Sequence, residues 1–123
     1  MGENHKLTLI YLDDEEINLI MFSEMFKKDF NIFTTTSPDE ALTFLKENKV
    51  DLIVTDQLMP IMTGVEFLRE IKQLFPETHA KRIMISGYTR EGEIEEALED
   101  ELLDEFVSKP WKYDELRRIL TVS

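Results

Sequence analysis

Residues 51–56 read Asp-Leu-Ile-Val-Thr-Asp, a mostly apolar run that ends in a carboxylate. A run that is nearly all apolar is typical of a central strand in a parallel sheet, because helices cover such a strand on both faces. Asp56 follows the carboxyl end of this strand, and ligands of open α/β sheets bind beyond that end. The stretch therefore predicts an α/β fold with a polar site at the end of a central strand.

On both sides of this run, short apolar segments alternate with segments of helical period. We expect strands at 7–12, 30–34, 51–55, 82–85 and 106–107. The second and third helices begin with capping sequences, at residues 37–40 (Ser-Pro-Asp-Glu) and 63–66 (Thr-Gly-Val-Glu). The apolar positions at helical spacing are Ile17, Ile20, Met21 and Met25; Ala41, Phe44 and Leu45; Leu68, Ile71 and Phe75; Ile94, Ala97, Leu98 and Leu102; and Leu116, Ile119 and Leu120. Five strand-helix units without a linker predict one doubly wound α/β domain over residues 1–123.

Composition excludes several classes of function. The formal net charge is −12, which would repel the phosphates of a nucleic acid, so we expect no direct nucleic-acid contact. No apolar run reaches the roughly 18 residues of a membrane span. The absence of cysteine excludes disulfides and thiolate metal sites. Together with an N-terminus that lacks the apolar core of a signal peptide, these features predict a cytoplasmic protein.

Polar residues follow several of the expected strands and should meet at one edge of the sheet. They are Asp13, Asp14, Asp56, Ser86 and Lys109. Two carboxylates about 4 Å apart repel by roughly 4 kcal/mol at an effective dielectric near 20, so three that converge need compensation. Lys109 offsets one charge, and a divalent cation would offset the rest. Oxygen ligands without histidine or cysteine favour a hard ion, and few protein ligands favour Mg²⁺ over Ca²⁺.

Asp56 is the best candidate for a nucleophile, because it is central and alone at the end of its strand. Aspartate can form a covalent aspartyl phosphate, and a cation together with Lys109 would stabilise charge on the transferring phosphoryl group. Asp13 and Asp14 are better placed as metal ligands. The sequence therefore predicts a magnesium-dependent site for a phosphoryl group.

The same residues belong to a longer ordered set. It comprises Asp13-Asp14-Glu15, Asp56, Met59-Pro60, Gly64, Ser86, Phe106 and Lys109-Pro110. In this order, the set resembles the receiver domain of two-component response regulators, the family of the chemotaxis regulator. The resemblance covers Leu7 to about Leu120. It implies a flavodoxin-like, five-stranded parallel sheet with strand order 2-1-3-4-5, and a cis peptide bond before Pro110.

The resemblance also implies a role for each site residue. Asp56 accepts the phosphoryl group from a sensor histidine kinase or a phosphotransfer protein. Asp14 binds Mg²⁺ directly, Asp13 binds it largely through water, and the backbone carbonyl of Leu58 is a further ligand. Lys109 contacts a phosphoryl oxygen. Such a domain is a signalling switch rather than an enzyme, although it carries out its own phosphotransfer and dephosphorylation.

Ser86 and Phe106 are the implied switch residues. Both turn inward on phosphorylation, and the change reaches the face formed by the fourth helix, the fifth strand and the last helix. We expect an output domain or a partner protein on that face. The acidic fourth helix and the Arg117-Arg118 pair place opposite charges there, which would support a symmetric homodimer across a two-fold axis.

Departures from the family pattern lead to further predictions. Gly87 stands where alanine is commoner and should loosen the loop that follows the fourth strand. Phe106 lacks the tyrosine hydroxyl common at its position, so its switch would rest on packing alone. Leu58 and Tyr88 flank the expected path of the hydrolytic water, and both are bulky. We therefore predict slow self-dephosphorylation, with a decay rate that changes when both residues are replaced by alanine.

Two other functions remain as alternatives. A phosphatase of the haloacid dehalogenase kind would use Asp13 as its nucleophile, but that family has Asp-x-Asp after the first strand, where this chain has Asp-Asp-Glu. An adaptor that works without phosphorylation would not need all five site residues. Taken singly, Asp13 or Asp14 could cap a helix, and Ser86 or Lys109 could be ordinary turn or surface residues. The sequence leaves open the kinase, the output, the phosphoryl lifetime, the oligomeric state, and whether the domain is part of a larger regulator.

Overall fold

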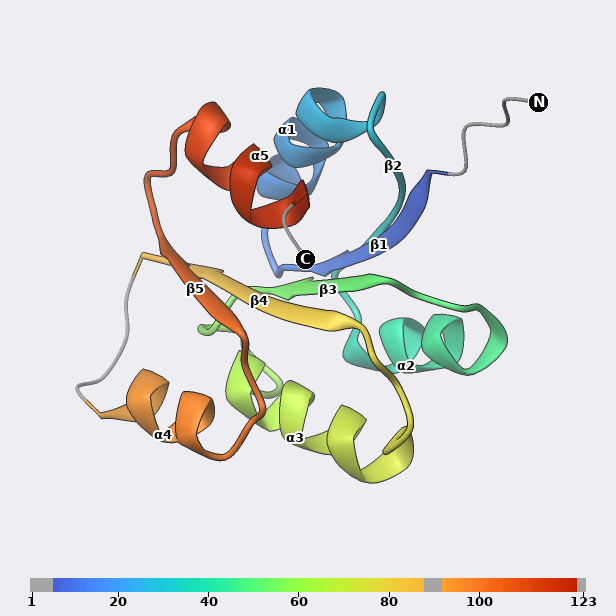
Figure 1. Cartoon of the computed structure of the whole chain (residues 1–123), viewed down its shortest axis with the longest axis vertical. Helices are drawn as coiled ribbons and strands as arrows, with labels where there is room; N and C mark the ends of the chain where they lie inside the picture. Colours follow the sequence, from blue (N-terminus) through green and yellow to red (C-terminus); the bar gives the residue numbers. More distant parts are fainter. Residues whose placement is uncertain (1–5, 88–91, 122–123) are drawn as a thin grey trace.

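Strands and helices alternate along the whole described chain (Figure 1). The structure is a computed structural model that describes residues 6–87 and 92–121. Its elements are β1 (Leu7–Leu12), α1 (Glu16–Phe26), β2 (Phe30–Thr35), α2 (Pro38–Glu47), β3 (Leu52–Thr55), α3 (Gly64–Leu74), β4 (Lys81–Ser86), α4 (Glu93–Glu99), β5 (Glu105–Ser108) and α5 (Tyr113–Thr121). Within these residues, no helix is long and apolar enough to cross a bilayer.

The strands form one parallel sheet in the order β2-β1-β3-β4-β5, as predicted. The strand bounds differ from the expected ones by no more than one residue at either end. Both capping sequences are also confirmed. Ser37 accepts a hydrogen bond from the backbone N–H of Glu40, and Thr63 and Glu66 form a reciprocal capping box at the start of α3. Local sequence therefore sets where α2 and α3 begin.

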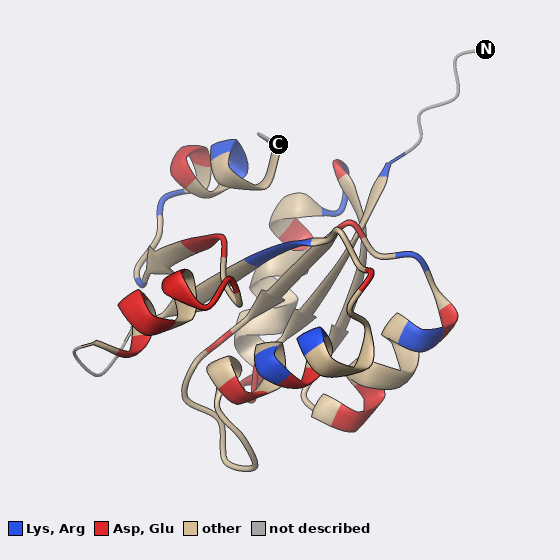
Figure 2. Ribbon diagram, turned by 60° about the horizontal axis from the view of Figure 1, so that its bottom comes forward, with Lys and Arg blue, Asp and Glu red and all other residues tan. Residues whose placement is uncertain are grey.

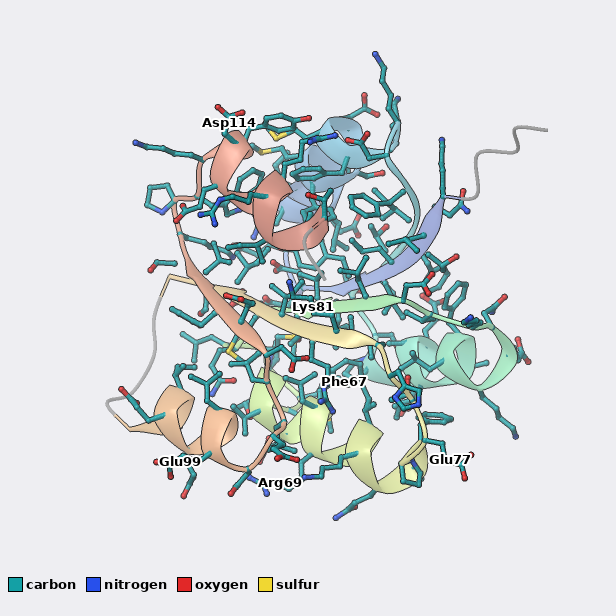
Figure 3. All side chains as sticks on the ribbon, viewed as in Figure 1. Phe67, Arg69, Glu77, Lys81, Glu99 and Asp114 are labelled. Carbon is teal, nitrogen blue, oxygen red and sulfur yellow. The ribbon has the colours of Figure 1, made fainter. Side chains whose placement is uncertain are left out.

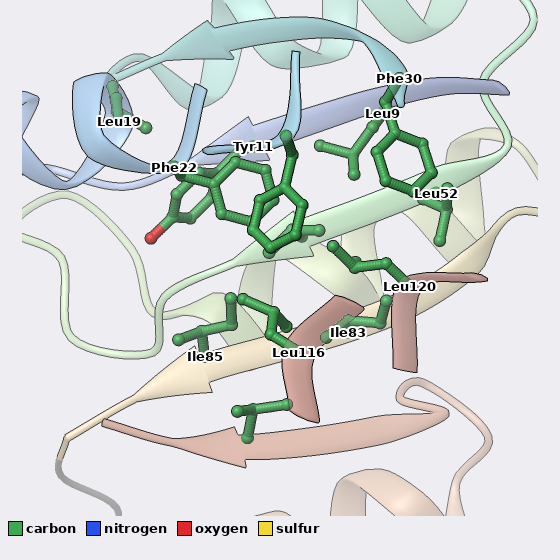
Figure 4. Close-up of a cluster of buried hydrophobic side chains, with 13 residues drawn as sticks. Leu9, Tyr11, Leu19, Phe22, Phe30, Leu52, Ile83, Ile85, Leu116 and Leu120 are labelled. Atoms are coloured by element: carbon green, nitrogen blue, oxygen red, sulfur yellow. The ribbon is translucent and has the colours of Figure 1, made fainter. Parts of the chain in front are cut away.

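Helices cover both faces of the sheet, with α1 and α5 on one face and α2, α3 and α4 on the other (Figure 1). Two hydrophobic cores result. Leu52 and Val54 of β3 belong to the core beneath α1 and α5, which is drawn in Figure 4. Ile53 points to the opposite core, where Phe67 of α3 packs against the sheet (Figure 3). Because both faces of β3 are buried, every position of the strand is apolar except its last.

Helix α1 is confirmed, but the residues whose spacing predicted it lie on its exposed side. Ile17 is 60% exposed and Ile20 is 57% exposed. Met21 and Met25 are exposed as well. The buried side of the helix consists of Leu19, Phe22 and Phe26. The helix is apolar on both sides, so helical spacing fits either side, and the aromatic rings take the inner one: the centroid of the Phe22 ring lies 4.7 Å from that of Tyr11.

The turn between β3 and α3 brings two backbone segments unusually close together. A Cβ atom on Gly64 would lie 2.2 Å from the carbonyl oxygen of Asp56 and 3.0 Å from Cε of Met84. The backbone N–H of Gly64 donates to the carbonyl oxygen of Gln57 at 3.0 Å. Only glycine permits this approach. Gly64 therefore fixes the start of α3 against the end of β3.

Helix α4 is short, acidic and weakly buried. Its seven residues include three acidic side chains in the first turn, and Ala97 is its buried residue. Figure 2 shows the concentration of acidic residues on this helix. Carboxylates near a helix N-terminus are favourable, so the charges help α4 to form, but they contribute little packing against the rest of the domain.

Candidate functional site

Three carboxylates meet at the carboxyl ends of β1 and β3. Asp13, Asp14 and Asp56 each place an oxygen atom so that all three atoms lie within 4.8 Å of one another. Asp13 is fully buried, Asp56 is 7% exposed and Asp14 is exposed. The parallel pairing of β1 with β3 sets Leu12 opposite Thr55, so the residues that follow both strands are neighbours. The predicted convergence of these carboxylates is therefore present in the structure.

Asp13 is held by contacts on both of its oxygen atoms. The hydroxyl of Tyr11 donates to its Oδ2 at 2.8 Å, and the amide of Asn18 donates to the same atom at 3.2 Å. The backbone N–H of Glu15 donates to Oδ1 at 2.9 Å. Burial, and then the Asp13 carboxylate, raises the pKa of Tyr11 above its ordinary value, so this hydroxyl keeps its proton. Tyr11 and Asn18 therefore fix the Asp13 carboxylate, although neither residue stands out in the sequence.

Lys109 reaches the cluster from the end of β5. Its Nζ lies 3.3 Å from Oδ2 of Asp56 and 3.5 Å from Oδ2 of Asp13. Its backbone N–H donates to the carbonyl oxygen of Ser86 at 3.0 Å, and the peptide bond to Pro110 is cis, as expected. One ammonium therefore contacts two buried carboxylates, and it leaves the third without a positive partner among the described residues.

Asp14 completes the cluster on the solvent side. Although it is largely exposed, loss of part of its hydration raises its pKa above the ordinary value, and repulsion by Asp13 and Asp56 acts in the same direction. A divalent cation would relieve this repulsion. The donor set consists of carboxylate oxygens, which suits a hard ion such as Mg²⁺. The residues present therefore fit the expected metal.

A surface hollow of about 300 Å³ opens over this cluster. It is lined by Asp14, Glu15, Asp56, Leu58, Ser86, Gly87 and Lys109. Ser86 is thus in the same hollow as Asp56, and the side chain of Leu58 is half exposed at its rim. A larger cavity of about 690 Å³ is lined by the carboxyl ends of α2 and α3 and by the residues that precede β3 and β4. It lies at the opposite ends of the strands from the site, and none of the three clustered carboxylates lines it.

Some of the predicted residues lie away from the hollow. Phe106 is half-buried on β5 next to Met84 of β4, within the core beneath α3 and α4. Its movement stays a prediction. Tyr88 falls outside the described residues, so its predicted role in dephosphorylation has no structural account. Arg117 pairs with Asp29 of the same chain at 3.4 Å, and the expected homodimer also stays a prediction.

Comparisons with known proteins identify the family. The profile described as "Response regulator receiver domain" matches residues 9–121. The chain therefore belongs to the family of response regulator receiver domains, which are domains of two-component systems. This confirms the resemblance inferred from the ordered set of site residues.

Particular relatives differ widely in length. The hydrogenase transcriptional regulatory protein HoxA of Cupriavidus necator is 36% identical over 109 residues, which cover 89% of this chain and 22% of that protein. Sporulation initiation phosphotransferase F of Bacillus subtilis is 28% identical over 115 residues, which cover 93% of this chain and 89% of that protein. The chain thus spans about a fifth of the length of HoxA.

Solved structures agree with the fold. The signal receiver domain of an HD domain-containing protein from Pseudomonas fluorescens Pf-5 matches with a TM-score of 0.84 and 25% sequence identity. The match covers 94% of this chain and 92% of that one. The flavodoxin-like receiver fold expected from the sequence is confirmed.

Proposed function

We propose that this domain accepts a phosphoryl group on Asp56, with Mg²⁺ bound, and acts as a signalling switch rather than as an enzyme. The observation that carries the proposal is the position of the Asp56 carboxylate, which lies 3.3 Å from Lys109 and within reach of Asp13 and Asp14. Family membership and a relative named as a phosphotransferase support it. The donor is a histidine kinase or a phosphotransfer protein.

The transfer needs a nucleophile and compensation of charge. A carboxylate oxygen of Asp56 attacks phosphorus, the bond from phosphorus to the donor breaks, and the electron pair of that bond leaves with the donor atom. The Lys109 ammonium stays beside the reacting oxygen and stabilises negative charge on the phosphoryl group. Asp14, Asp13, Asp56 and the carbonyl of Leu58 would hold Mg²⁺. When bound, the ion supplies further neutralisation of phosphoryl charge.

The environment of Asp13 argues against a phosphatase of the haloacid dehalogenase kind. Such an enzyme would need Asp13 as a free nucleophile. Here Asp13 is fully buried, and its Oδ2 contacts Tyr11, Asn18 and Lys109 at once. A buried carboxylate that accepts several hydrogen bonds is a positioned ligand or structural group, and it has little access to a phosphorylated substrate.

Intact mass spectrometry tests the proposal directly. Incubation of the domain with acetyl phosphate and Mg²⁺ is expected to add the mass of one phosphoryl group. The adduct should be released by hydroxylamine, because an acyl phosphate is labile to it and a phosphoserine is not. Chelation of Mg²⁺ should prevent the addition. No adduct, or an adduct that survives hydroxylamine, would overturn the proposal.

Replacing Asp14 with asparagine should separate metal binding from folding. At free Mg²⁺ about 100 times its dissociation constant, mass action adds roughly 2.7 kcal/mol to the stability of the folded wild type. The variant is expected to lose most of this gain, while its metal-free form melts no lower than the wild type because one repelling charge is gone. Thermal denaturation with Mg²⁺ and with chelator measures both effects.

The control for this experiment is Glu99→Gln, which removes an exposed carboxylate on α4 outside the cluster. It should keep the full response to Mg²⁺. An equal response in the Asp14 variant would contradict the assignment of Asp14 as a metal ligand.

The exposed apolar side of α1 is the proposed contact for a protein donor. Helix α1 begins two residues after Asp14, and Ile17, Ile20 and Met21 of its outer side are exposed. Leu58 adds an exposed apolar residue at the rim of the hollow. Solvent-exposed apolar residues gathered beside a reactive group are typical of an interaction surface.

Ile20→Glu should therefore distinguish protein donors from small ones. We expect phosphotransfer from a histidine kinase or phosphotransfer protein to slow by about 30-fold, the effect of losing a strong interface contact. Phosphorylation by acetyl phosphate should keep its wild-type rate, because the site itself is intact. Leu74→Glu, at an equally exposed apolar position near the carboxyl end of α3, is the control. Equal slowing with both donors would place Ile20 outside the interface.

A further inference from the structure

We infer that Gln57 is a positioning residue that couples the state of Asp56 to the start of α4 through a hydrogen bond with Glu93. The amide Nε2 of Gln57 donates to Oε1 of Glu93 at 3.0 Å. The part of the inference that concerns phosphorylation rests on the function proposed above. The contact itself, and its effect on α4, are independent of that function.

Gln57 is attached to three places at once. Its backbone N–H donates to Oδ1 of Asp56 at 2.7 Å. Its side-chain Oε1 accepts from the backbone N–H of Val65 in the first turn of α3 at 2.9 Å, while Nε2 reaches Glu93. The residue is 2% exposed. A buried glutamine with both ends of its amide satisfied has a fixed orientation, because turning the amide would leave polar groups unpaired.

The contact with α3 is rigid. The carbonyl oxygen of Gln57 accepts from the backbone N–H of Gly64, and the backbone of Gly64 approaches the Asp56 carbonyl so closely that even a Cβ atom would not fit between them. Gln57 is therefore tied to α3 by two hydrogen bonds from the α3 backbone. A displacement of Gln57 cannot be absorbed on this side without breaking both of them.

The contact with α4 is the one that can yield. Within the helix only Ala97 is buried, so packing holds α4 weakly. At its far end, Lys72 of α3 donates to the carbonyl oxygen of Asp100 at 2.7 Å, and Arg69 lies 3.9 Å from the carboxylate of that residue. The hydrogen bond from Gln57 to Glu93 supplies the corresponding polar contact at the first residue of the helix.

Phosphorylation would act on Gln57 at its backbone. Oδ1 of Asp56 accepts from the Gln57 N–H, while the oxygen beside Lys109 is Oδ2. A phosphoryl group on Oδ2 removes the negative charge that the carboxylate shares between both atoms, and so changes the acceptor that faces Gln57. Since the α3 contacts are rigid, the change is transmitted to Glu93. The Gln57–Glu93 hydrogen bond is present when Asp56 is a free carboxylate, and phosphorylation would disturb it. The hydrogen bond therefore favours the carboxylate form of Asp56. By linkage, its removal favours the phosphorylated form.

Four proteins test this inference: the wild type, Glu93→Ala, Glu93→Gln and Glu95→Ala. Glutamine at position 93 keeps an oxygen acceptor for Gln57. Glu95 is exposed on the same helical turn, and its side chain makes no hydrogen bond or ion pair with any described residue. Glu95→Ala therefore removes the same charge as Glu93→Ala without removing a hydrogen bond. The first measurement is amide hydrogen exchange across residues 93–99. The second is the affinity for beryllofluoride with Mg²⁺, a mimic of the phosphoryl group.

Glu93→Ala is expected to exchange faster in α4 than the wild type. It should also bind beryllofluoride about fivefold more tightly, which is the size of effect expected from the loss of one typical hydrogen bond. Glu93→Gln and Glu95→Ala should resemble the wild type in both measurements. A mere loss of structure would weaken binding of the mimic, not strengthen it.

Two results would overturn the inference. One is unchanged exchange in Glu93→Ala, which would show that the hydrogen bond does not hold α4. The other is faster exchange with unchanged or weaker binding of the mimic, which would show that the hydrogen bond holds α4 without coupling it to Asp56. If the wild type itself binds no beryllofluoride, the proposed function fails, and hydrogen exchange still decides whether Gln57 holds α4.

Discussion

Asp56→Asn is expected to gain no phosphoryl mass from acetyl phosphate and Mg²⁺ under conditions that label the wild type fully. The carboxamide has nearly the same shape as the carboxylate, so its oxygen can still accept from the backbone N–H of Gln57, while its NH2 group replaces the oxygen that faces Lys109. It lacks the anionic oxygen that attacks phosphorus, so an acyl phosphate cannot form at this position. The expected loss is complete within the detection limit of intact mass spectrometry.

Asp51→Asn is the matched control for this prediction. Asp51 immediately precedes β3 and therefore lies at the opposite end of the strand, where its carboxylate accepts from the backbone N–H of Thr8 at 2.9 Å. The control should be phosphorylated like the wild type. A persistent, hydroxylamine-labile adduct in Asp56→Asn would assign the phosphoryl group to another carboxylate, with Asp13 and Asp14 the nearest candidates.

Gly64→Ala is expected to destabilise the domain by about 3 kcal/mol, the upper end of the usual range for core overpacking. The added Cβ would lie 2.2 Å from the carbonyl oxygen of Asp56, so one of the two backbone segments must move. Movement breaks the hydrogen bonds that Gln57 makes with the start of α3, at 3.0 Å to Gly64 and 2.9 Å to Val65. Urea denaturation followed by circular dichroism measures the change in the free energy of unfolding.

Gly87→Ala provides the contrast, because it adds the same methyl group at the same end of the sheet, directly after β4. Its Cβ would lie 3.6 Å from Cβ of Lys109, an ordinary van der Waals distance. Loss of freedom in the unfolded chain should then stabilise this variant by about 0.4–1 kcal/mol. If the two glycine variants unfold at the same urea concentration, steric exclusion at Gly64 is not what determines the turn.

The strands and the carboxylate cluster could be predicted from sequence because both follow from local patterns. An apolar run bounded by polar residues identifies a strand, and parallel strands must end at a common edge, so Asp13, Asp14 and Asp56 converge without knowledge of the tertiary structure. The inner side of α1 could not be predicted in the same way. Both sides of that helix are apolar, and only the packing of Phe22 against Tyr11 decides between them.

Most of the hydrogen bonds that hold the site residues in place could not be predicted from the sequence. Tyr11, Asn18 and Gln57 are ordinary residues in their local sequence, and their importance comes from hydrogen bonds to partners that the fold brings near. For Tyr11 there was a usable signal. It is the one polar aromatic residue in the apolar run of β1, and a buried tyrosine hydroxyl needs a hydrogen-bond partner.

The pairing of β1 with β3 has a consequence for how the domain can be monitored. Asp13 and Asp56 are distant in the chain and come together only when these two strands lie side by side in register. Lys109 joins them only when β5 is paired with β4, as the edge strand on the far side of the sheet from β2. A nascent or partly unfolded chain has the acceptor carboxylate but not its neighbours. The rate of labelling by a small phosphodonor would therefore report the fraction of molecules whose whole sheet is assembled.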